Sequence, residues 1–445
     1  QTMDGNYRFG DFYDGEVYDA TLDLNQAKWR AADIYRPKIK PQITARYGCC
    51  VTAHERLKPL SHFPAKNGKE EIYDFGRNFA GVVSLRITGK KGQKVTVRHA
   101  EIVTDGDLNV KSLRTAKATL VYICRDGEQE YSPHLTYMGF RYIGVSGIAP
   151  ENVEVCALVL HSDFEETGSF ECSDPLLNQL ESNIRWSGKS NFVDIPTDCP
   201  QRDERMGWTG DISVFAKTAC FNFDLAAFLE KWLYDVRAEQ GHGGGLPLVV
   251  PKQGIAAPTV ATACWADCIV LVPWAEYLAR GDKELLRTMY PAMKKYLKAV
   301  RFWASLSGPG KYRRHIWKWL FQFGDWCAPE GGIFDWMKRG REIATAYYAN
   351  SCRIVSEIAR ILGKSEDAEY YASLVGKIGE AFRHVFTDGK GTLKKEFQTG
   401  YVLPLAFGIA KGAERETMVN NLDRLVQEKD YHLSTGFTGT PYLLF

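Results

Sequence analysis

The hydrophobic pattern of the first third of the chain predicts β-strands. Residues 72–89 and 93–103 alternate between apolar and polar positions and are rich in Val, Ile and Thr, with the turn-forming sequence GKKGQ between them. The alternation continues over 119–127, 140–150 and 153–164. Short strands separated by glycine-rich turns are typical of two antiparallel sheets packed face to face, so we predict a β-sandwich.

From about residue 170 the apolar positions recur with the period of a helix. The segment FECSDPLLNQLESNIRWSGKSN begins with Ser173 as a candidate cap and has Asp and Pro in its first turn. Because the helical segments lack a heptad seam and a repeat of fixed period, they favour an α/α toroid over a coiled coil or a regular solenoid. The other predicted helices cover 223–240, 260–280, 282–305, 343–362, 366–386 and 413–428.

The change of period divides the chain into domains. We predict a β-sandwich domain over residues 61–168 and a helical domain over 169–445. Residues 1–60 are less regular and are interpreted as the end of an N-terminal accessory domain and a connection. The chain opens on Gln, and its last segment, LSTGFTGTPYLLF, stops inside an apolar element, so we expect truncation at both ends.

Composition places the chain among soluble globular proteins and argues against several classes. Apolar residues make up 45% of the 445 positions, and 56 basic against 54 acidic residues give a net charge of +2. This balance predicts no nucleic-acid partner, and the lack of a long apolar run predicts no membrane-spanning segment. The 11 cysteines include no CxxC pair with a matching His cluster, so we interpret them as free thiols and predict no metal site.

One short segment concentrates the candidate chemistry. Residues 194–211, DIPTDCPQRDERMGWTGD, hold five carboxylates, two arginines and a tryptophan on a backbone interrupted by two prolines and two glycines. We predict a loop between two helices, loosened in its second half by Gly207 and Gly210, in which Arg202 and Arg205 are the counterions of the carboxylates. Charges of both signs separate the pKa values of neighbouring carboxyls, so one can hold a proton while another stays ionised.

This arrangement has two interpretations. The first is the hydrolysis of a glycosidic bond. That reaction needs a protonated acid, an ionised carboxylate and fixed acceptors for hydroxyl groups, and Trp208 would add an apolar plane beside them. Alternatively, the Arg–Asp pairs are a structural cluster that closes the helical domain. The residues by themselves leave both interpretations open.

The segment DCPQRDERMGWTGD resembles the signature of the bacterial α-L-rhamnosidases of glycoside hydrolase family 78. YDFGRNFAGVVSLRITG, RHAEIV, LRTAKATLVYI and YMGFRYIGVSG are similar to that family's β-sandwich, and FGDW, IATAYY and LSTGFTGTPYLL to later parts of its (α/α)6 barrel. YDGEVYDA resembles the end of its N-terminal accessory domain. The resemblance covers essentially the whole chain. It implies an antiparallel β-sandwich followed by an (α/α)6-barrel catalytic domain that is incomplete at its C-terminus.

The resemblance implies an inverting hydrolase that releases terminal, non-reducing α-L-rhamnose. Glu204 would be the general acid. Asp203 is the competing carboxylate, because adjacent loop residues usually point apart and only one can face the sugar. The residues that would bind the sugar or line its pocket are Asp198, Arg202, Trp208 and Asp211.

Two further positions are candidate substrate-binding residues. Trp265, in the sequence CWAD, either stacks on the methyl face of rhamnose or is an aromatic residue of the core. Asp325, in FGDW, is predicted to accept a hydrogen bond from a sugar hydroxyl.

The chain departs from the family at the general base. The family's base is a glutamate C-terminal to the segment matching LSTGFTGTPYLL, and Glu330, Glu342 and Glu396 do not lie in that context. An inverting enzyme holds its base about 6.5–9.5 Å from the acid. We therefore expect the base beyond Phe445, with weak binding and poor turnover by this chain alone. Two alternatives stay open: a carbohydrate-binding protein with an incomplete catalytic site, and another (α/α)6-barrel glycosidase or lyase.

The implied mechanism requires no metal or organic cofactor. The expected ligands are rhamnose-containing glycosides or polysaccharides, and the expected assembly is a homodimer. The implied source is bacterial, and both cytoplasm and periplasm remain open, although free cysteines favour a reducing or anaerobic setting. The natural rhamnoside and its linkage are not encoded in any of these patterns.

Overall fold

The computed structural model describes residues 3–23, 25, 28–41, 43–45, 47–254, 260–318 and 321–444. The chain separates into two compact units, Gln1–Met206 and Gly207–Phe445. In the described parts of the chain, no helix has the length and apolar character that crossing a lipid bilayer requires.

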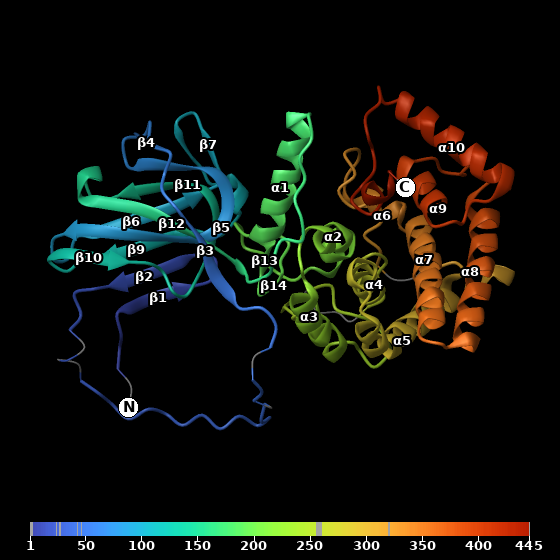
Figure 1. Cartoon of the computed structure of the whole chain (residues 1–445), viewed down its shortest axis with the longest axis horizontal. Helices are drawn as coiled ribbons and strands as arrows, with labels where there is room; N and C mark the ends of the chain where they lie inside the picture. Colours follow the sequence, from blue (N-terminus) through green and yellow to red (C-terminus); the bar gives the residue numbers. More distant parts are fainter. Residues whose placement is uncertain are drawn as a thin grey trace. The chain divides into compact units, whose positions relative to one another are not determined.

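The first unit is built on a ten-stranded sheet with the order β1-β2-β9-β6-β11-β5-β12-β3, in which β4 and β10 also pair with β5 (Figure 1). A separate small hairpin consists of β7 (Ile102–Thr104) and β8 (Asp107–Asn109). The strands of the large sheet are β1 (Tyr7–Asp11), β2 (Gly15–Asp19), β3 (Val51–Leu57), β4 (Ser61–Pro64), β5 (Glu71–Gly89), β6 (Lys94–Ala100), β9 (Thr119–Ile123), β10 (Gly127–Tyr131), β11 (Met138–Ser146) and β12 (Val153–Ser162).

Strand β5 organises this unit because its 19 residues pair with different strands at its two ends. The first part pairs with β4 and β11, and the second part pairs with β10 and β12. Between the two parts the register with β11 shifts near Gly76, which adopts a φ of 79° that glycine tolerates without strain. The alternation of the sequence predicted β5, β6, β9, β11 and β12 but not β4 or β10, and the N-terminal β domain that it indicated is confirmed.

Residues 1–60 contribute three strands to the same sheet, whereas the sequence suggested only an irregular end and a connection. β2 lies parallel to β9, from the pair Gly15 and Thr119 onward, and β1 lies antiparallel to β2. A Cβ atom on Gly15 would lie 2.0 Å from the backbone oxygen of Thr119, so this pairing requires glycine. The proposed division into domains at residues 60 and 168 stays a prediction.

Helix α1 (Pro175–Asn191) is part of the first unit and contacts β5 and β12. Its N-cap is Asp174, which accepts the Leu176 N–H at 2.8 Å, so the prediction of Ser173 as the cap was wrong by one residue. Pro175 occupies the first helical position, where its missing N–H costs no hydrogen bond.

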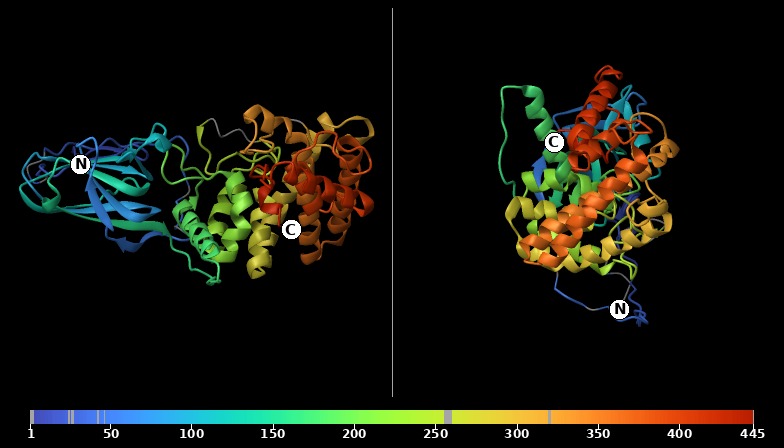
Figure 2. Two further views of the ribbon diagram at one scale, coloured as in Figure 1. Left: turned by 90° about the horizontal axis from the view of Figure 1, so that it is seen from above. Right: turned by 90° about the vertical axis from the view of Figure 1, so that its right-hand side faces the viewer.

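The second unit is helical. Helix pairs pack side by side, α4 with α5, α7 with α8 and α9 with α10, as expected of a barrel built from hairpins (Figure 2). The sequence pattern missed α2, α6 and α9 and began α4 eight residues too early. The helices are α2 (Thr209–Asn222), α3 (Ala226–Ala238), α4 (Cys268–Arg280), α5 (Lys283–Ser307), α6 (Ile333–Lys338), α7 (Gly340–Ile361), α8 (Ser365–Phe386), α9 (Gln398–Ala406) and α10 (Gly412–Gln427).

Large aromatic side chains and thiols fill the core of this unit. Trp232 and Trp317 are both fully buried, and the Trp232 indole N–H donates to the Val250 carbonyl at 3.0 Å. All 11 cysteines of the chain are free thiols, and those of α2, α4 and α7 are buried. These thiols act as small apolar side chains in the packing.

Two glycines determine how α2 begins. A Cβ atom on Gly207 would lie 2.1 Å from the Val250 carbonyl oxygen, and one on Gly210 would lie 2.5 Å from the Trp265 indole. Both glycines therefore permit close packing. The prediction that they loosen the backbone was wrong, since Gly210 is buried inside the first turn of the helix.

Asp267, just before α4, is a fully buried carboxyl in this core. One oxygen accepts the Cys264 N–H at 2.7 Å and the other accepts the Ser351 hydroxyl at 2.5 Å, and no ion pair reaches it among the described residues. Burial raises the pKa of Asp267 from 3.8 to about 6, because desolvation disfavours the charged form.

We expect Gly207→Ala to destabilise the protein by about 1–3 kcal/mol, as overpacking of a filled site does. Gly243→Ala is the matched control, because a Cβ atom there would meet nothing within 4 Å. Thermal or chemical unfolding of the two variants measures the difference, and equal stability would contradict the close-packing role of Gly207.

We also expect Asp267 to make folding stability pH-dependent. The pKa of Asp267 is about 6 in the folded protein and 3.8 in the unfolded chain. The contribution of this carboxyl to the free energy of unfolding is therefore complete below the unfolded pKa and is lost as the pH rises through 6. The slope between the two values is about 1.4 kcal/mol per pH unit. In Asp267→Asn the side-chain amide can accept a hydrogen bond from the Cys264 N–H and donate one to the Ser351 hydroxyl. The free energy of unfolding of this variant, measured with urea from pH 4 to 8, should lack this slope. Parallel curves for the two proteins would refute the assignment.

Candidate active site

The charged motif at residues 194–211 begins as a tight hairpin and ends as a helix. Strands β13 (Phe192–Val193) and β14 (Ile195–Pro196) pair around Asp194, whose φ is 67°. Thr209, Gly210 and Asp211 form the first turn of α2, so the predicted loop is correct only as far as Trp208. The residues up to Met206 belong to the first unit and those from Gly207 to the second.

Glu204 lies between two guanidinium groups. Arg114 Nη1 donates to its Oε2 atom at 2.8 Å, and Arg202 Nε donates to the same oxygen at 3.0 Å. The Tyr13 hydroxyl donates to the Glu204 carbonyl at 2.8 Å and fixes the backbone. Among the described residues nothing donates a hydrogen bond to Oε1, which leaves one carboxylate oxygen for a substrate.

Asp198 supports the same loop from within. Its side chain is 5% exposed, and its two oxygens accept the Met206 N–H at 2.9 Å and contact Arg202 Nη2 at 3.5 Å. Burial raises the pKa of Asp198, while the hydrogen bond from Met206 opposes that rise. Arg202 thus pairs with both Asp198 and Glu204, and the prediction that this arginine is a counterion of the carboxylates is confirmed.

Asp203 points to a different partner from Glu204. Its carboxylate accepts a hydrogen bond from the Thr115 hydroxyl, and this bond is the main reason that the pKa of Asp203 lies below its ordinary value. A carboxyl that ionises so readily is a poor proton donor at neutral pH. The adjacent carboxylates therefore differ in environment, as expected for neighbouring loop residues.

Arg205 is not a counterion of the carboxylates, so that prediction was wrong. The residue is 4% exposed with a φ of 48°, and its guanidinium donates to the carbonyls of Phe12 at 2.9 Å and Gln201 at 3.2 Å, and to that of Tyr137. Its guanidinium carbon also lies between 5.3 and 5.6 Å from the ring centroids of Phe12, Tyr13 and Tyr137. Carbonyl dipoles and ring faces thus compensate this buried cation.

Three side chains of this cluster have the composition of a metal site. Ligand atoms of Asp198, Cys199 and Glu204 lie within 4.8 Å of one another. Two guanidinium groups already compensate the carboxylates, and burial raises the pKa of the Cys199 thiol to about 12, so the thiolate that a metal prefers is disfavoured. These groups do not fit a metal ion well, and the expectation that the protein needs none remains a prediction.

The second unit holds the remaining predicted residues. Trp208 is the N-cap residue of α2 and forms a β-bridge with Val249, and its buried indole N–H has no partner among the described residues. Asp211 lies in the first turn of α2, where the helix dipole favours a negative charge.

Trp265 is packed as a core aromatic residue. It is 3% exposed, its ring is stacked on Phe323 with centroids 3.9 Å apart, and the edges of Phe437 and Trp326 meet it at 4.9 and 6.5 Å. Of the two interpretations given by the sequence, this packing supports the core residue. Stacking on a sugar remains untested.

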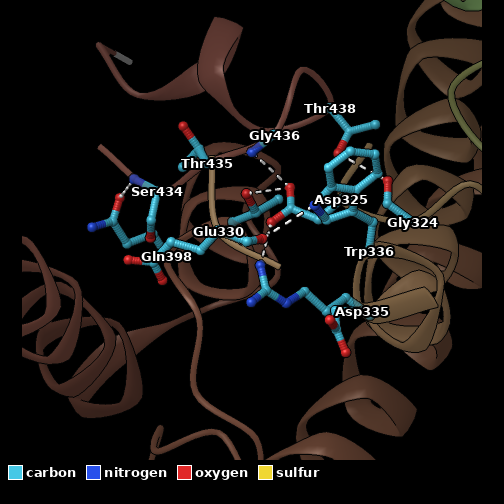
Figure 3. A network of polar contacts seen from close by, with 12 residues as sticks. Gly324, Asp325, Glu330, Asp335, Trp336, Gln398, Ser434, Thr435, Gly436 and Thr438 are labelled. Carbon is cyan, nitrogen blue, oxygen red and sulfur yellow. Dashed lines mark hydrogen bonds and ion pairs between the residues drawn. The ribbon is translucent and has the colours of Figure 1, made fainter. Parts of the chain in front are cut away.

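Asp325 is the centre of a hydrogen-bond network, and Figure 3 shows how backbone and side-chain groups converge on it. Its side chain is fully buried and accepts from the Thr399 hydroxyl at 2.7 Å, the Gly436 N–H at 2.9 Å and Arg339 at 3.0 Å. Burial raises the pKa of Asp325, and these three donors oppose the rise. The carboxylate holds the FGDW and STGFTGT segments together, and its predicted contact with a sugar hydroxyl remains untested.

The other candidate carboxylates have protein partners or are buried. Glu330 pairs with Lys429 at 2.6 Å, and Glu396 accepts from the Tyr401 hydroxyl at 2.8 Å and pairs with Arg424. Burial raises the pKa of Glu342, which opposes the ionised state that a general base needs.

The sequence reasoning missed the residues that the β domain contributes around Glu204. Arg114, Thr115 and Tyr13 all contact the segment 203–204, although they precede it by about ninety positions or more in the chain. These residues could have been found from the segment LRTAKATLVYI, which resembles the family and begins with the polar residues Arg114 and Thr115 after a leucine.

Comparisons with known proteins agree with this organisation. Residues 65–161 match the bacterial α-L-rhamnosidase concanavalin-like domain, and residues 165–445 match the six-hairpin glycosidase domain of the same proteins. An α-L-rhamnosidase of Streptomyces avermitilis is 36% identical over 453 residues, covering 98% of this chain and 42% of that protein. One from Formosa agariphila is 34% identical, covering 99% and 48%.

Solved structures give the same result. The α-L-rhamnosidase of Aspergillus terreus superposes with a TM-score of 0.89 at 34% identity, covering 99% of this chain and 52% of that one. The Streptomyces avermitilis enzyme, solved in complex with L-rhamnose, has a TM-score of 0.88 at 35% identity, covering 99% and 42%.

The chain spans about half the length of the curated relatives that it matches, between 42% and 49%. The six-hairpin match alone covers more than half of its residues and follows directly on the β domain. The chain therefore belongs to the bacterial α-L-rhamnosidases of glycoside hydrolase family 78, with an N-terminal β domain followed by a six-hairpin (α/α)6 glycosidase domain.

Proposed function

We propose that the protein is an α-L-rhamnosidase that releases terminal, non-reducing α-L-rhamnose from rhamnosides with inversion, and that Glu204 is its general acid. The observation that carries this proposal is the environment of Glu204. One carboxylate oxygen is held by Arg114 and Arg202, and the other has no protein partner among the described residues. The relative from Streptomyces avermitilis, which was solved with L-rhamnose, supports the choice of sugar.

In this mechanism Glu204 protonates the glycosidic oxygen as the bond to the anomeric carbon breaks, and a water attacks the opposite face of the sugar. Arg202 and Asp198 form a fixed polar pair that can hold sugar hydroxyls. The Asp198 carboxyl is aligned by the Met206 N–H, so its orientation is set before substrate binds.

The remaining roles rest on the sequence resemblance. Asp211 would accept a hydroxyl, Trp208 would line the rhamnose pocket, and Trp265 and Asp325 would contribute directly or by ordering the loops that they hold. We assign the general base to none of Glu330, Glu342 and Glu396, because their ion pairs or their burial oppose that role.

We expect Glu204→Gln in the complete gene product to lower kcat by about 10²–10⁴-fold, the usual contribution of a general acid. The loss should be larger for methyl α-L-rhamnoside than for 4-nitrophenyl α-L-rhamnoside, because 4-nitrophenolate leaves with little protonation. Steady-state kinetics on both substrates measure the effect. An equal loss on the two substrates would contradict the role of proton donor, and an inactive parent protein would contradict the substrate class.

Asp203→Asn is the matched control, since it neutralises the adjacent carboxylate. We expect less than a tenfold loss of kcat, because Asp203 bonds to Thr115 and is ionised at neutral pH. A larger loss of kcat in Asp203→Asn than in Glu204→Gln would identify Asp203 as the general acid.

Arg114→Gln removes one of the two guanidinium groups that hold Oε2 of Glu204. Because Arg202 alone then orients the carboxyl, we expect kcat to fall about tenfold, the effect of one lost hydrogen bond to a charged group. Arg125→Gln, at an exposed arginine of the same domain, should leave kcat unchanged. An unchanged kcat in Arg114→Gln would show that this ion pair does not position the acid.

A further inference from the structure

The first unit contains a cavity of about 750 Å³ between α1 and the sheet. Binding sites for small molecules usually occupy about 300–1,000 Å³, so the volume suffices for a sugar unit and its hydration. Cys199, Asp198 and Arg202 form part of the wall, so the cavity lies beside the residues that hold Glu204.

One wall is the polar face of α1. Gln179, Asn183, Trp186 and Ser190 line the cavity at helical spacing, and the Gln179 amide donates to Asn183 Oδ1 at 2.8 Å. A helix that only covered a sheet would place apolar residues there. The helix instead leaves its leucines exposed, with Leu176, Leu177 and Leu180 at 78%, 48% and 52%.

The opposite wall comes from the β domain and is held rigidly. The Arg77 guanidinium carbon lies 3.7 Å from the ring centroid of Trp186, and Arg77 also pairs with Glu55. Asn78 donates to Glu101 at 2.7 Å. Fixed donors and acceptors of this kind, next to an indole, suit a ligand that carries many hydroxyl groups.

Amide and hydroxyl side chains predominate on the α1 wall of the cavity, among them Gln179, Ser182, Asn183, Ser187 and Ser190. A flat, apolar aglycone would cover these polar groups without replacing their hydrogen bonds to water, which costs free energy. A sugar offers hydroxyl groups that can bond to them.

We propose that this cavity binds the sugar unit to which the terminal rhamnose is attached, so that the preferred substrates are rhamnosyl saccharides rather than rhamnosides of flat aromatic alcohols. The assignment rests on the proposed function, since it places rhamnose beside Glu204 and the next sugar along α1. Gln179, Asn183 and the Arg77–Trp186 pair are then specificity-determining residues. A site built to bond hydroxyl groups discriminates strongly against ligands that lack them.

The test compares binding of rutinose, a rhamnosyl-glucose disaccharide, with binding of L-rhamnose. The complete gene product carrying Glu204→Gln is titrated by NMR, so that rutinose is not consumed. We expect rutinose to bind more tightly than rhamnose. Adding Gln179→Ala and Asn183→Ala should weaken rutinose binding about tenfold and leave rhamnose binding unchanged, since each lost hydrogen bond contributes modestly.

Leu180→Ala is the matched control, because Leu180 lies on the same helix and does not line the cavity. It should change neither affinity. With Glu204 restored, the double variant should keep its kcat/KM on 4-nitrophenyl α-L-rhamnoside, which has no second sugar.

Equal affinity for rutinose and rhamnose, or unchanged rutinose binding in the double variant, would overturn the cavity assignment while leaving the proposed activity intact. Failure of the proposed function looks different: neither sugar binds, and the parent does not hydrolyse the aryl rhamnoside. That result would remove both proposals.

Discussion

The candidate site depends on the burial of Arg205. This cation is removed from water, and carbonyl oxygens of the β domain and of its own loop replace the lost hydration, together with three aromatic faces. Its left-handed backbone turns the chain immediately after Glu204. An uncompensated buried charge is strongly destabilising, so the loop has one well-defined conformation in which these contacts are made. The positions of Glu204 and Asp198 follow from that conformation.

Two adjacent carboxylates acquire different chemistry from what surrounds them. Asp203 meets a hydroxyl donor, which stabilises its charge, while Glu204 meets two guanidinium groups on a single oxygen. Both sets of partners include residues of the β domain, Thr115 and Arg114. The β domain thus supplies part of the candidate catalytic environment in addition to its own fold.

In the second unit, buried polar and aromatic contacts order the loops. Asp325 ties the FGDW segment to Gly436 and Thr399, and a Cβ atom on Gly436 would lie 2.5 Å from two backbone oxygens, so glycine is required there. Trp265 packs against Gly210 at the start of α2. These contacts give both candidate residues a structural role whether or not they touch a sugar.

The sequence by itself determined the β domain, the helical domain, the strands of its five alternating segments and the long helices, because periods of two and of 3.6 residues are local properties of the chain. It also located the charged motif and identified Arg202 as a counterion of the carboxylates. It misplaced the cap of α1, and it missed α2 because Gly207 and Gly210 resemble turn signals. It also assigned Arg205 as a counterion of the carboxylates, which was wrong. Only the tertiary structure decided which cation meets which carboxylate, that β2 pairs with β9, and that α1 directs a polar face into a cavity. Those outcomes depend on residues far apart in the sequence, and the desolvation that makes each contact favourable or costly exists only after the chain has folded.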